Sequence, residues 1–198
     1  MGGTTHTYYT VLSTPQTPMS TPWTEVLDAA CAWASGETTA SQVVENITTG
    51  AYTSDYKDYN FDYSHCDTTS TGSIHFELYD FLSDDNCDCK DMAAVVQVYS
   101  NALGVSSVYM KRISGPFYYQ SIDPIGTTNP DGWISSDEWN YHQVGWYSSS
   151  VYDACLRLDQ SSPRVPRGED INDEYKDDLY SNGTWNVNSG TASIGTLD

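Results

Sequence analysis

The sequence predicts an α+β domain in which helices pack on one side of a small antiparallel sheet. Three observations support this fold class. Apolar residues recur at helical spacing in three segments, 22–36, 40–50 and 89–104. Apolar and aromatic residues typical of strands fill three others, 108–113, 141–147 and 151–155. At 198 residues, the chain is long enough for one domain with a substantial core.

Proline and glycine mark the ends of the first two predicted helices. Pro22 suits the first position of a helix, and Gly36 suits the position just after one. The second helix carries an apolar stripe from Ala40 to Ile47, and Gly50 is expected to end it.

Four further segments have weaker patterns. Residues 1–20 are rich in Thr, Ser and Pro and are expected to form an extended N-terminal arm. Residues 51–72 indicate a long surface loop, and residues 74–78 fit either a strand or the start of a helix. Residues 161–198, rich in Pro, Asp and Asn, are expected to form an irregular strap over the sheet within the same domain.

Cys89 is the strongest candidate for a catalytic residue, because it opens the third predicted helix. Acidic and amide side chains between Asp84 and Asp88 precede it and favour a helix N-cap. A helix N-terminus and a neighbouring imidazolium both lower the pKa of a thiol, and the thiolate is the reactive species. His142 on one predicted strand and Asp153 on the next would supply the imidazole and the acid that orients it. The three residues predict a thiol nucleophile triad.

The spacing between His142 and Asp153 favours a hairpin. Ser148-Ser149-Ser150 reads as a short polar turn between the two strands. If the hairpin is centred between Tyr147 and Ser148, His142 lies directly opposite Asp153, with Cβ atoms about 4.5–5.5 Å apart on one face. An imidazole–carboxylate hydrogen bond spans that distance, although a bulge would change the register.

The other four cysteines are interpreted as buried thiols or disulfide partners: Cys31, Cys66, Cys87 and Cys155. Five cysteines permit two disulfides and one free thiol. Cys87 and Cys89 together with His65-Cys66 lack a standard zinc spacing, so no metal site is assigned to them.

In these segments the chain resembles the transglutaminase-like superfamily, which has a papain-like fold and a Cys-His-Asp triad. The resemblance covers roughly residues 80–160, and one departure is Cys87, which stands where the family has a Gly. Three motifs occur in the order and at the spacing of the family: Cys89, Asp91 and Ala93 with Leu103-Gly104-Val105; His142-Gln143-Val144-Gly145-Trp146; and Tyr152-Asp153. The resemblance implies a transglutaminase-like catalytic domain over residues 21–160.

The resemblance also implies cysteine-dependent acyl transfer on protein or peptide carboxamides, without a required cofactor. Cys89 would attack the carbonyl, His142 would protonate the leaving amine, and Asp153 would orient His142. An amine co-substrate (transamidation) or water (deamidation or proteolysis) would then resolve the thioester. The backbone N–H of Cys89 would supply half of the oxyanion hole, and the second donor, an upstream aromatic or amide, is not assigned.

A different class of function remains open. The resemblance also allows a catalytically silent transglutaminase-like module, used for binding or assembly within a larger protein, because a fold does not fix a function. Retention of Cys89, His142 and Asp153 together argues against this alternative.

Three aromatic residues near His142 are candidate substrate-binding residues: Trp139, Tyr141 and Trp146. They would form the walls of an acyl pocket. The alternative is that they belong to the core, which is the commoner role of aromatic residues on strands.

The net charge of −19 bears on partners. It repels phosphate groups, which excludes nucleic acid and anionic membranes as expected partners and favours cationic ones such as amines. The alternative is an acidic surface that only keeps the protein in solution. The sequence has no apolar run long enough for a membrane span. Only 8 Lys and Arg residues among many Thr, Ser, Tyr and Asn residues favour a secreted or cell-surface protein.

The segment Thr127–Glu138 follows most ligand positions of an EF-hand calcium loop, including Asn129 and Asp131. Thr127 occupies the first position, where the pattern has Asp. The favoured interpretation is therefore a turn before the strand that carries His142, and calcium binding is the minority interpretation.

Overall fold

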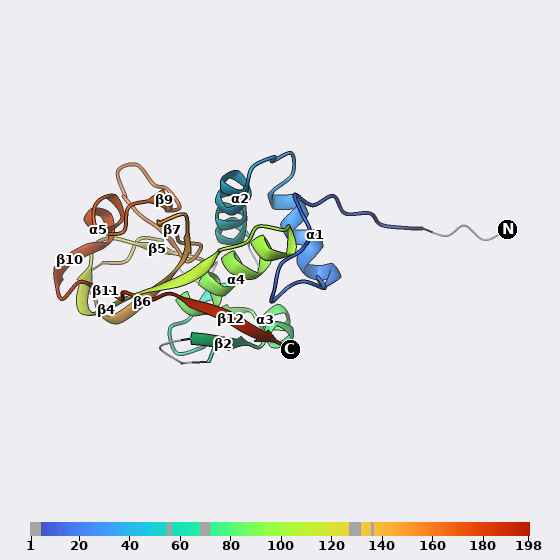
Figure 1. The fold of residues 1–198 in the computed structure, drawn as a ribbon. Helices are drawn as coiled ribbons and strands as arrows, with labels where there is room; N and C mark the ends of the chain where they lie inside the picture. Colours follow the sequence, from blue (N-terminus) through green and yellow to red (C-terminus); the bar gives the residue numbers. More distant parts are fainter. Residues whose placement is uncertain (1–4, 55–56, 68–71, 127–131, 136) are drawn as a thin grey trace.

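A computed structural model describes residues 5–54, 57–67, 72–126, 132–135 and 137–198. The predicted α+β class is confirmed: within these ranges the chain forms five α-helices and a main sheet of eight strands (Figure 1). The sheet is mostly antiparallel, as expected, but larger than the small sheet that the sequence predicts.

The main sheet brings strands from the two halves of the chain together. Its strands run in the order β2-β12-β4-β6-β7-β9, and β10 and β11 also pair with β4. All these pairs are antiparallel except that between β2 and β12, which is parallel. The strands are β2 (Gly72–Phe76), β4 (Tyr109–Tyr119), β6 (Glu138–Tyr147), β7 (Ser150–Tyr152), β9 (Arg167–Glu169), β10 (Tyr180–Gly183), β11 (Asn186–Val187) and β12 (Ala192–Leu197).

Two short strand pairs lie apart from the main sheet. In one, β1 (Asp58–Tyr59) runs parallel to β3 (Asn86–Cys87), just before the third predicted helix begins. In the other, β5 (Asp123–Pro124) is antiparallel to β8 (Leu156–Arg157). The β1–β3 pair is important for the site, because it carries Tyr59 to the start of that helix.

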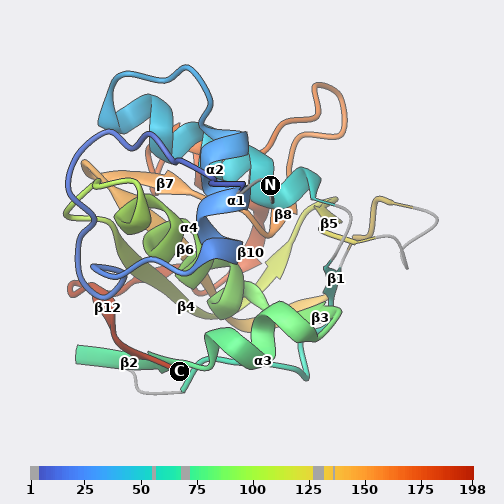
Figure 2. The same cartoon turned by 90° about the vertical axis from the view of Figure 1, so that its right-hand side faces the viewer.

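Helix α4 (Cys89–Ala102) is the centre of the molecule. It lies between the sheet and two other helices, α1 (Thr24–Trp33) and α2 (Ala40–Thr53) (Figures 1 and 2). All of its residues are buried, so the helix is enclosed on every side rather than half-exposed. Two shorter helices, α3 (Leu78–Ser83) and α5 (Glu174–Leu179), lie nearer the ends of the sheet.

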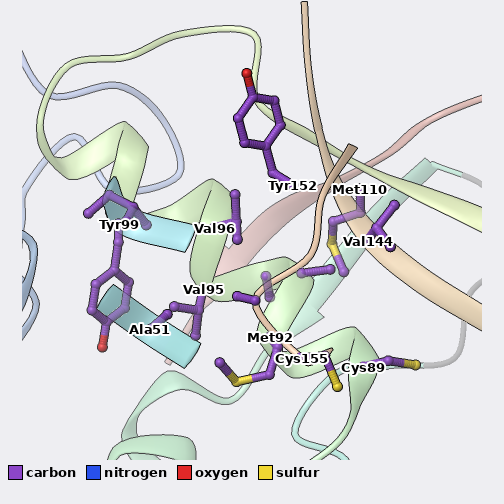
Figure 3. Close-up of a cluster of buried hydrophobic side chains, with 14 of the residues drawn as sticks. Ala51, Cys89, Met92, Val95, Val96, Tyr99, Met110, Val144, Tyr152 and Cys155 are labelled. Carbon is purple, nitrogen blue, oxygen red and sulfur yellow. The ribbon is translucent and has the colours of Figure 1, made fainter. Parts of the chain in front are cut away.

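Close packing around α4 explains two glycines. A Cβ added at Gly145 of β6 would stand 2.7 Å from Cγ1 of Val96, so only glycine lets this strand approach the helix closely. Figure 3 shows Val96 in the cluster between α4 and the sheet, with Cys89 and Cys155 at one end of that cluster. A Cβ at Gly50 would stand 2.2 Å from Cγ of Trp33. The predicted helix end at Gly50 is therefore wrong: α2 continues to Thr53, and this glycine serves the contact between α1 and α2.

The C-terminal segment also corrects the sequence-based expectation. Residues 161–198 are not an irregular strap, because they contain β9, α5, β10, β11 and β12. Gln97 of α4 holds β12 in place, since its amide donates to Oγ of Ser193 (2.8 Å) and accepts from the backbone N–H of Ile194 (3.1 Å). The C-terminal strands pair with segments that are far away in the sequence, and the periodicity of a single segment does not predict such pairing.

The N-terminal arm is partly attached to the rest of the fold. Leu12 and Gln16 donate backbone hydrogen bonds to the carbonyls of Leu103 (3.0 Å) and Asn101 (2.8 Å), at the end of α4. Met19 is buried. The expected loop over 51–72 contains the end of α2 and the strand β1, and residues 74–78 form the end of β2 and then the first residue of α3. Within the described ranges, every helix is too short or too polar to cross a membrane.

Candidate active site

The first turn of α4 is closed by a capping box that fixes the position of Cys89. Oδ1 of Asp88 accepts hydrogen bonds from the backbone N–H groups of Lys90 (2.8 Å) and Asp91 (3.0 Å). Oδ2 of Asp91 accepts one from the N–H of Asp88 (3.2 Å). Cys89 therefore becomes the first helical residue, and the helix dipole points its positive end at this turn.

Asp91 has a structural role in addition to closing the cap. Its Oδ1 accepts the backbone N–H of His65 at 2.9 Å, which ties the loop before β2 to the helix. Burial, together with the charge of Asp88, raises the pKa of Asp91 to about 7. The acid two residues after Cys89 is thus a part of the scaffold that holds this turn.

His142 and Asp153 form a buried pair. Nε2 of His142 lies 2.9 Å from Oδ2 of Asp153, and each side chain is only 1% exposed. The backbone N–H of Cys155 donates to Oδ1 of Asp153 at 2.9 Å. The hydroxyl of Tyr175, from α5, donates to Oδ2 at 2.7 Å. The Asp153 carboxylate therefore has three hydrogen-bonding partners, as a buried polar group requires.

Tyr175 is a site residue that sequence reasoning missed. It is fully buried, and its segment was interpreted as an irregular strap. Burial and then the neighbouring Asp153 raise the pKa of its phenol well above the usual value, so the hydroxyl stays protonated and can donate. Tyr175 and Leu179 are both buried and stand four residues apart in α5. That helical spacing is the signal that could have identified the segment as packed.

The predicted hairpin register is wrong by two residues. Gly145 pairs with Tyr152 and Tyr147 with Ser150, so the turn consists of Ser148 and Ser149. Both have positive φ angles, 51° and 66°, as in a two-residue type I′ turn, where Asn or Gly is the usual signal. A shift of two keeps side chains on the same face of a sheet. His142 and Asp153 are therefore diagonal rather than directly opposed, and the imidazole still reaches the carboxylate.

The surroundings of the His142 ring leave one nitrogen without a partner. Nδ1 is buried and has no hydrogen-bond partner among the described residues. The ring of Trp139 stacks on the imidazole, with centroids 4.9 Å apart and planes inclined by 18°. Because Asp153 holds Nε2 and Trp139 covers a ring face, Nδ1 is the atom through which this histidine can exchange a proton.

Cys89 lies against the strand that carries His142. The backbone N–H of Gln143 faces its sulfur and lowers the pKa of the thiol. Burial has the larger effect and raises that pKa well above the usual value, and the charge of Asp88 raises it further. The resting sulfur is therefore a neutral thiol. It is 5% exposed.

A cavity of about 270 Å³ opens at Cys89. Two of the three predicted aromatic residues, Trp139 and Tyr141, contribute to its wall. Trp146 does not: its ring lies under the ammonium group of Lys111, 5.4 Å from nitrogen to centroid. The full lining consists of aromatic and polar or acidic residues: Tyr59, Phe61, Asp88, Cys89, Asp137, Glu138, Trp139, Asn140 and Tyr141.

Tyr59 and Phe61 were not predicted as site residues, because their segment reads as a surface loop. The parallel pairing of β1 with β3 brings Tyr59 beside the first turn of α4. Burial and the neighbouring Cys89 raise the pKa of the Tyr59 phenol, so it is a neutral hydrogen-bond donor. The same two causes act on Tyr141.

All five cysteines are free thiols. Cys66, Cys87 and Cys155 are buried, and burial raises the pKa of each. Cys31 is half-buried on α1 rather than enclosed in the core, with its sulfur 3.9 Å from the carbonyl of Thr10. The disulfides that the cysteine count permits are not formed in this structure.

The calcium-like segment Thr127–Glu138 lies partly outside the described residues, which omit 127–131 and 136 and therefore Asn129 and Asp131. Its described part includes Ile134, whose backbone exchanges hydrogen bonds with Ile122 (2.7 and 2.8 Å). Across the part of the chain that the structure describes, no three His, Cys, Asp or Glu side chains are grouped to bind a metal ion.

No family model, curated protein or solved structure matches this chain. A proposal about function therefore depends on the positions of Cys89, His142 and Asp153 within this chain.

Proposed function

We propose that this chain is a cysteine-dependent acyl-transfer enzyme, of the papain-like type found in the transglutaminase-like superfamily. Its substrates are protein or peptide carboxamides. The observation that carries the proposal is the buried His142–Asp153 pair, 2.9 Å from Nε2 to Oδ2. His142 precedes Gln143, whose backbone N–H faces the Cys89 sulfur. A buried acid–imidazole pair beside a thiol at a helix N-terminus is an arrangement that activates nucleophiles.

In the first half of the reaction, the sulfur of Cys89 attacks the carbonyl carbon and its proton passes to Nδ1 of His142. Asp153 stabilises the imidazolium through Nε2. The tetrahedral intermediate then collapses: the C–N bond breaks, His142 returns the proton to the leaving amine, and a thioester remains on Cys89. Because burial raises the thiol pKa, the thiolate forms during attack and is scarce in the resting enzyme.

In the second half, an amine or water attacks the thioester and gives a proton to Nδ1 of His142. The C–S bond breaks and the proton returns to the sulfur. An amine acceptor yields a new amide, and water yields a carboxylic acid. The acidic lining residues Asp137 and Glu138 favour a cationic amine near the cavity.

The developing oxyanion needs two donors. The side chain of Asp88 engages the N–H groups of Lys90 and Asp91, so these two bonds of the cap do not use the N–H of Cys89. It is the first donor in this proposal. The second is the hydroxyl of Tyr59, a neutral phenol that lines the same cavity as Cys89.

One observation favours the second candidate function, a catalytically silent binding module. Cys89 is almost enclosed and its thiol pKa is raised, whereas reactive cysteines are commonly accessible and have a lowered pKa. A silent module would still offer the cavity at Cys89 to a ligand. The two functions differ in whether a thioester forms.

A glutamine-mimicking peptide that carries 6-diazo-5-oxonorleucine tests the enzymatic proposal. We expect one covalent adduct per chain, located on Cys89 by mass spectrometry. Cys89→Ala should abolish the adduct, and His142→Ala should slow it by at least about a hundredfold, the usual contribution of a general acid or base.

Cys87→Ala is the matched control, because Cys87 is a buried thiol two residues away that does not line the cavity. It should leave labelling largely intact. An adduct on Cys87 would overturn the assignment of Cys89 as the nucleophile. Slow labelling of several thiols without dependence on His142 contradicts the enzymatic proposal and supports the silent module.

A further inference from the structure

A second cavity of about 330 Å³ adjoins the one at Cys89. The two cavities share four residues in their walls: Tyr59, Phe61, Asp137 and Trp139. The two cavities are therefore neighbours, and together they are called the cleft: its first half opens at Cys89, and its far half is the second cavity.

The far half of this cleft is mainly apolar. Beyond the shared residues, its wall consists of Asn60, Tyr119, Pro124, Ile125 and Ile134. The ring centroids of Tyr119 and Trp139 lie 4.6 Å apart, with the ring planes inclined by 44°, so the two aromatic side chains pack against each other. Phe61 stands at the rim with 71% of its surface exposed. Large exposed apolar side chains beside a candidate active site indicate a surface that binds a partner and excludes water.

The charged residues of the cleft have one sign. Its lining includes the carboxylates of Asp88, Asp137 and Glu138, and none of its lining residues is Lys or Arg. Asp88 is compensated by Lys90, whose ammonium lies 3.4 Å away. Asp137 and Glu138 are exposed at the rim, so the cleft presents negative charge to an approaching ligand.

We infer that the cleft binds an extended peptide that carries a large aromatic or aliphatic side chain close in sequence to the carboxamide attacked by Cys89. That side chain occupies the far cavity between Phe61, Tyr119 and Trp139. Cationic residues flank it and face Asp137 and Glu138. The inference rests on the proposed function, which supplies the carboxamide, and adds to it the class of peptide that this site selects.

Trp139 joins the two halves of the cleft. One ring contact is with His142 at 4.9 Å and another is with Tyr119 at 4.6 Å. A side chain bound in the far cavity therefore excludes water from the same ring that covers the imidazole. Phe61, in contrast, contacts the peptide only and is the residue to test for selectivity.

The experiment measures binding in a Cys89→Ala background, so that no turnover occurs. The probes are fluorescein-labelled nine-residue peptides with a central glutamine, lysine at both ends and serine elsewhere. A single phenylalanine or alanine is placed in turn at each serine position. Fluorescence anisotropy gives the Kd. We expect phenylalanine at one position to lower the Kd roughly tenfold relative to alanine, the gain from burying one aromatic side chain.

Phe61→Ala should remove this gain. Tyr79→Ala is the matched control, because Tyr79 is an equally exposed aromatic residue (69%) on α3 and does not line the cleft. Replacing the terminal lysines by glutamates should weaken binding at low salt, and the difference should shrink at high salt.

Equal Kd values for phenylalanine and alanine at every position would overturn the inference, and so would a gain that survives Phe61→Ala. Self-association that is lost in Phe61→Ala would identify a second copy of the chain as the occupant and would also overturn it. The proposed function is tested separately by the adduct on Cys89. Phenylalanine-dependent binding without an adduct would support the peptide cleft and refute the enzyme, and an adduct without that preference would do the reverse.

Discussion

The first turn of α4 and the C-terminal segment 161–198 serve the same site, but interactions of different range build them. In the first turn, Asp88 and Asp91 close a capping box within four residues and fix Cys89. In the C-terminal segment, Tyr175 reaches Asp153 across 22 positions of the chain. The capping box can be predicted from neighbouring residues, and the contact between Tyr175 and Asp153 cannot. One part of this candidate site is thus encoded in a short motif, and the other part depends on the completed fold.

The largest expected effect concerns Asp153, the acid of the His142–Asp153 pair. Asp153→Asn should reduce turnover on an amide substrate by about three to four orders of magnitude while the chain stays folded, because an amide cannot stabilise the imidazolium and favours the wrong tautomer. Steady-state kinetics with circular dichroism as a folding check measure this.

Asp159→Asn is the matched control, since the Asp159 carboxylate accepts hydrogen bonds from Ser161 and Ser162 and has none with His142 in the described structure. Near wild-type turnover in Asp153→Asn would remove Asp153 from the site.

A smaller effect tests the hydrogen bond between Tyr175 and Asp153 by itself. Tyr175→Phe should lower turnover about tenfold, because one hydrogen bond to the Asp153 carboxylate is lost and the carboxylate becomes less precisely held.

Tyr180→Phe removes a hydroxyl from the same segment, one that donates to the carbonyl of Gly183 at 2.7 Å, and should leave turnover unchanged. If Tyr175→Phe lowers stability but does not change turnover, Tyr175 has a packing role only.

The last prediction concerns stability rather than turnover, and it tests Asp91 of the capping box. Burial and the charge of Asp88 raise the pKa of Asp91 from 3.8 to about 7. Between these values the folded chain holds a proton that the unfolded chain releases, so this group's contribution to the free energy of unfolding falls as pH rises from about 4 to about 7. Asp91→Asn has no such titration. We expect the stability of the wild type relative to Asp91→Asn, measured by urea denaturation, to decline over this range. A constant difference would show that Asp91 is ionised throughout.

The contrast between local and long-range contacts also explains which features the sequence could predict. The helix 89–104, its cap and the residues Cys89, His142 and Asp153 follow from spacing and from cap chemistry, and the structure brings His142 and Asp153 into contact. The turn was misplaced because Ser148 and Ser149 adopt positive φ angles without Gly or Asn to signal them.

Other parts of the site depend on pairing between distant segments. Tyr59 reaches the cavity because β1 pairs with β3 across more than two dozen residues. Trp146 is only four residues from His142, yet its ring lies against Lys111 and away from the cavity. Proximity in sequence therefore predicted the contact between His142 and Asp153 better than it predicted the walls of the cavity.

The position of β12 has a consequence for how the chain folds. β12 lies between β2 and β4, and among the described strands it is the one that connects β2 to the main sheet. Residues 72–76 must therefore wait for residues 192–197 before they join the sheet, although more than a hundred residues are synthesised between them. Pairing across such a separation is slow, because the entropy of closing a long loop is lost before any contact is gained. We therefore expect the edge of the molecule beside α3 to assemble last, after the helical layer and the central hairpins.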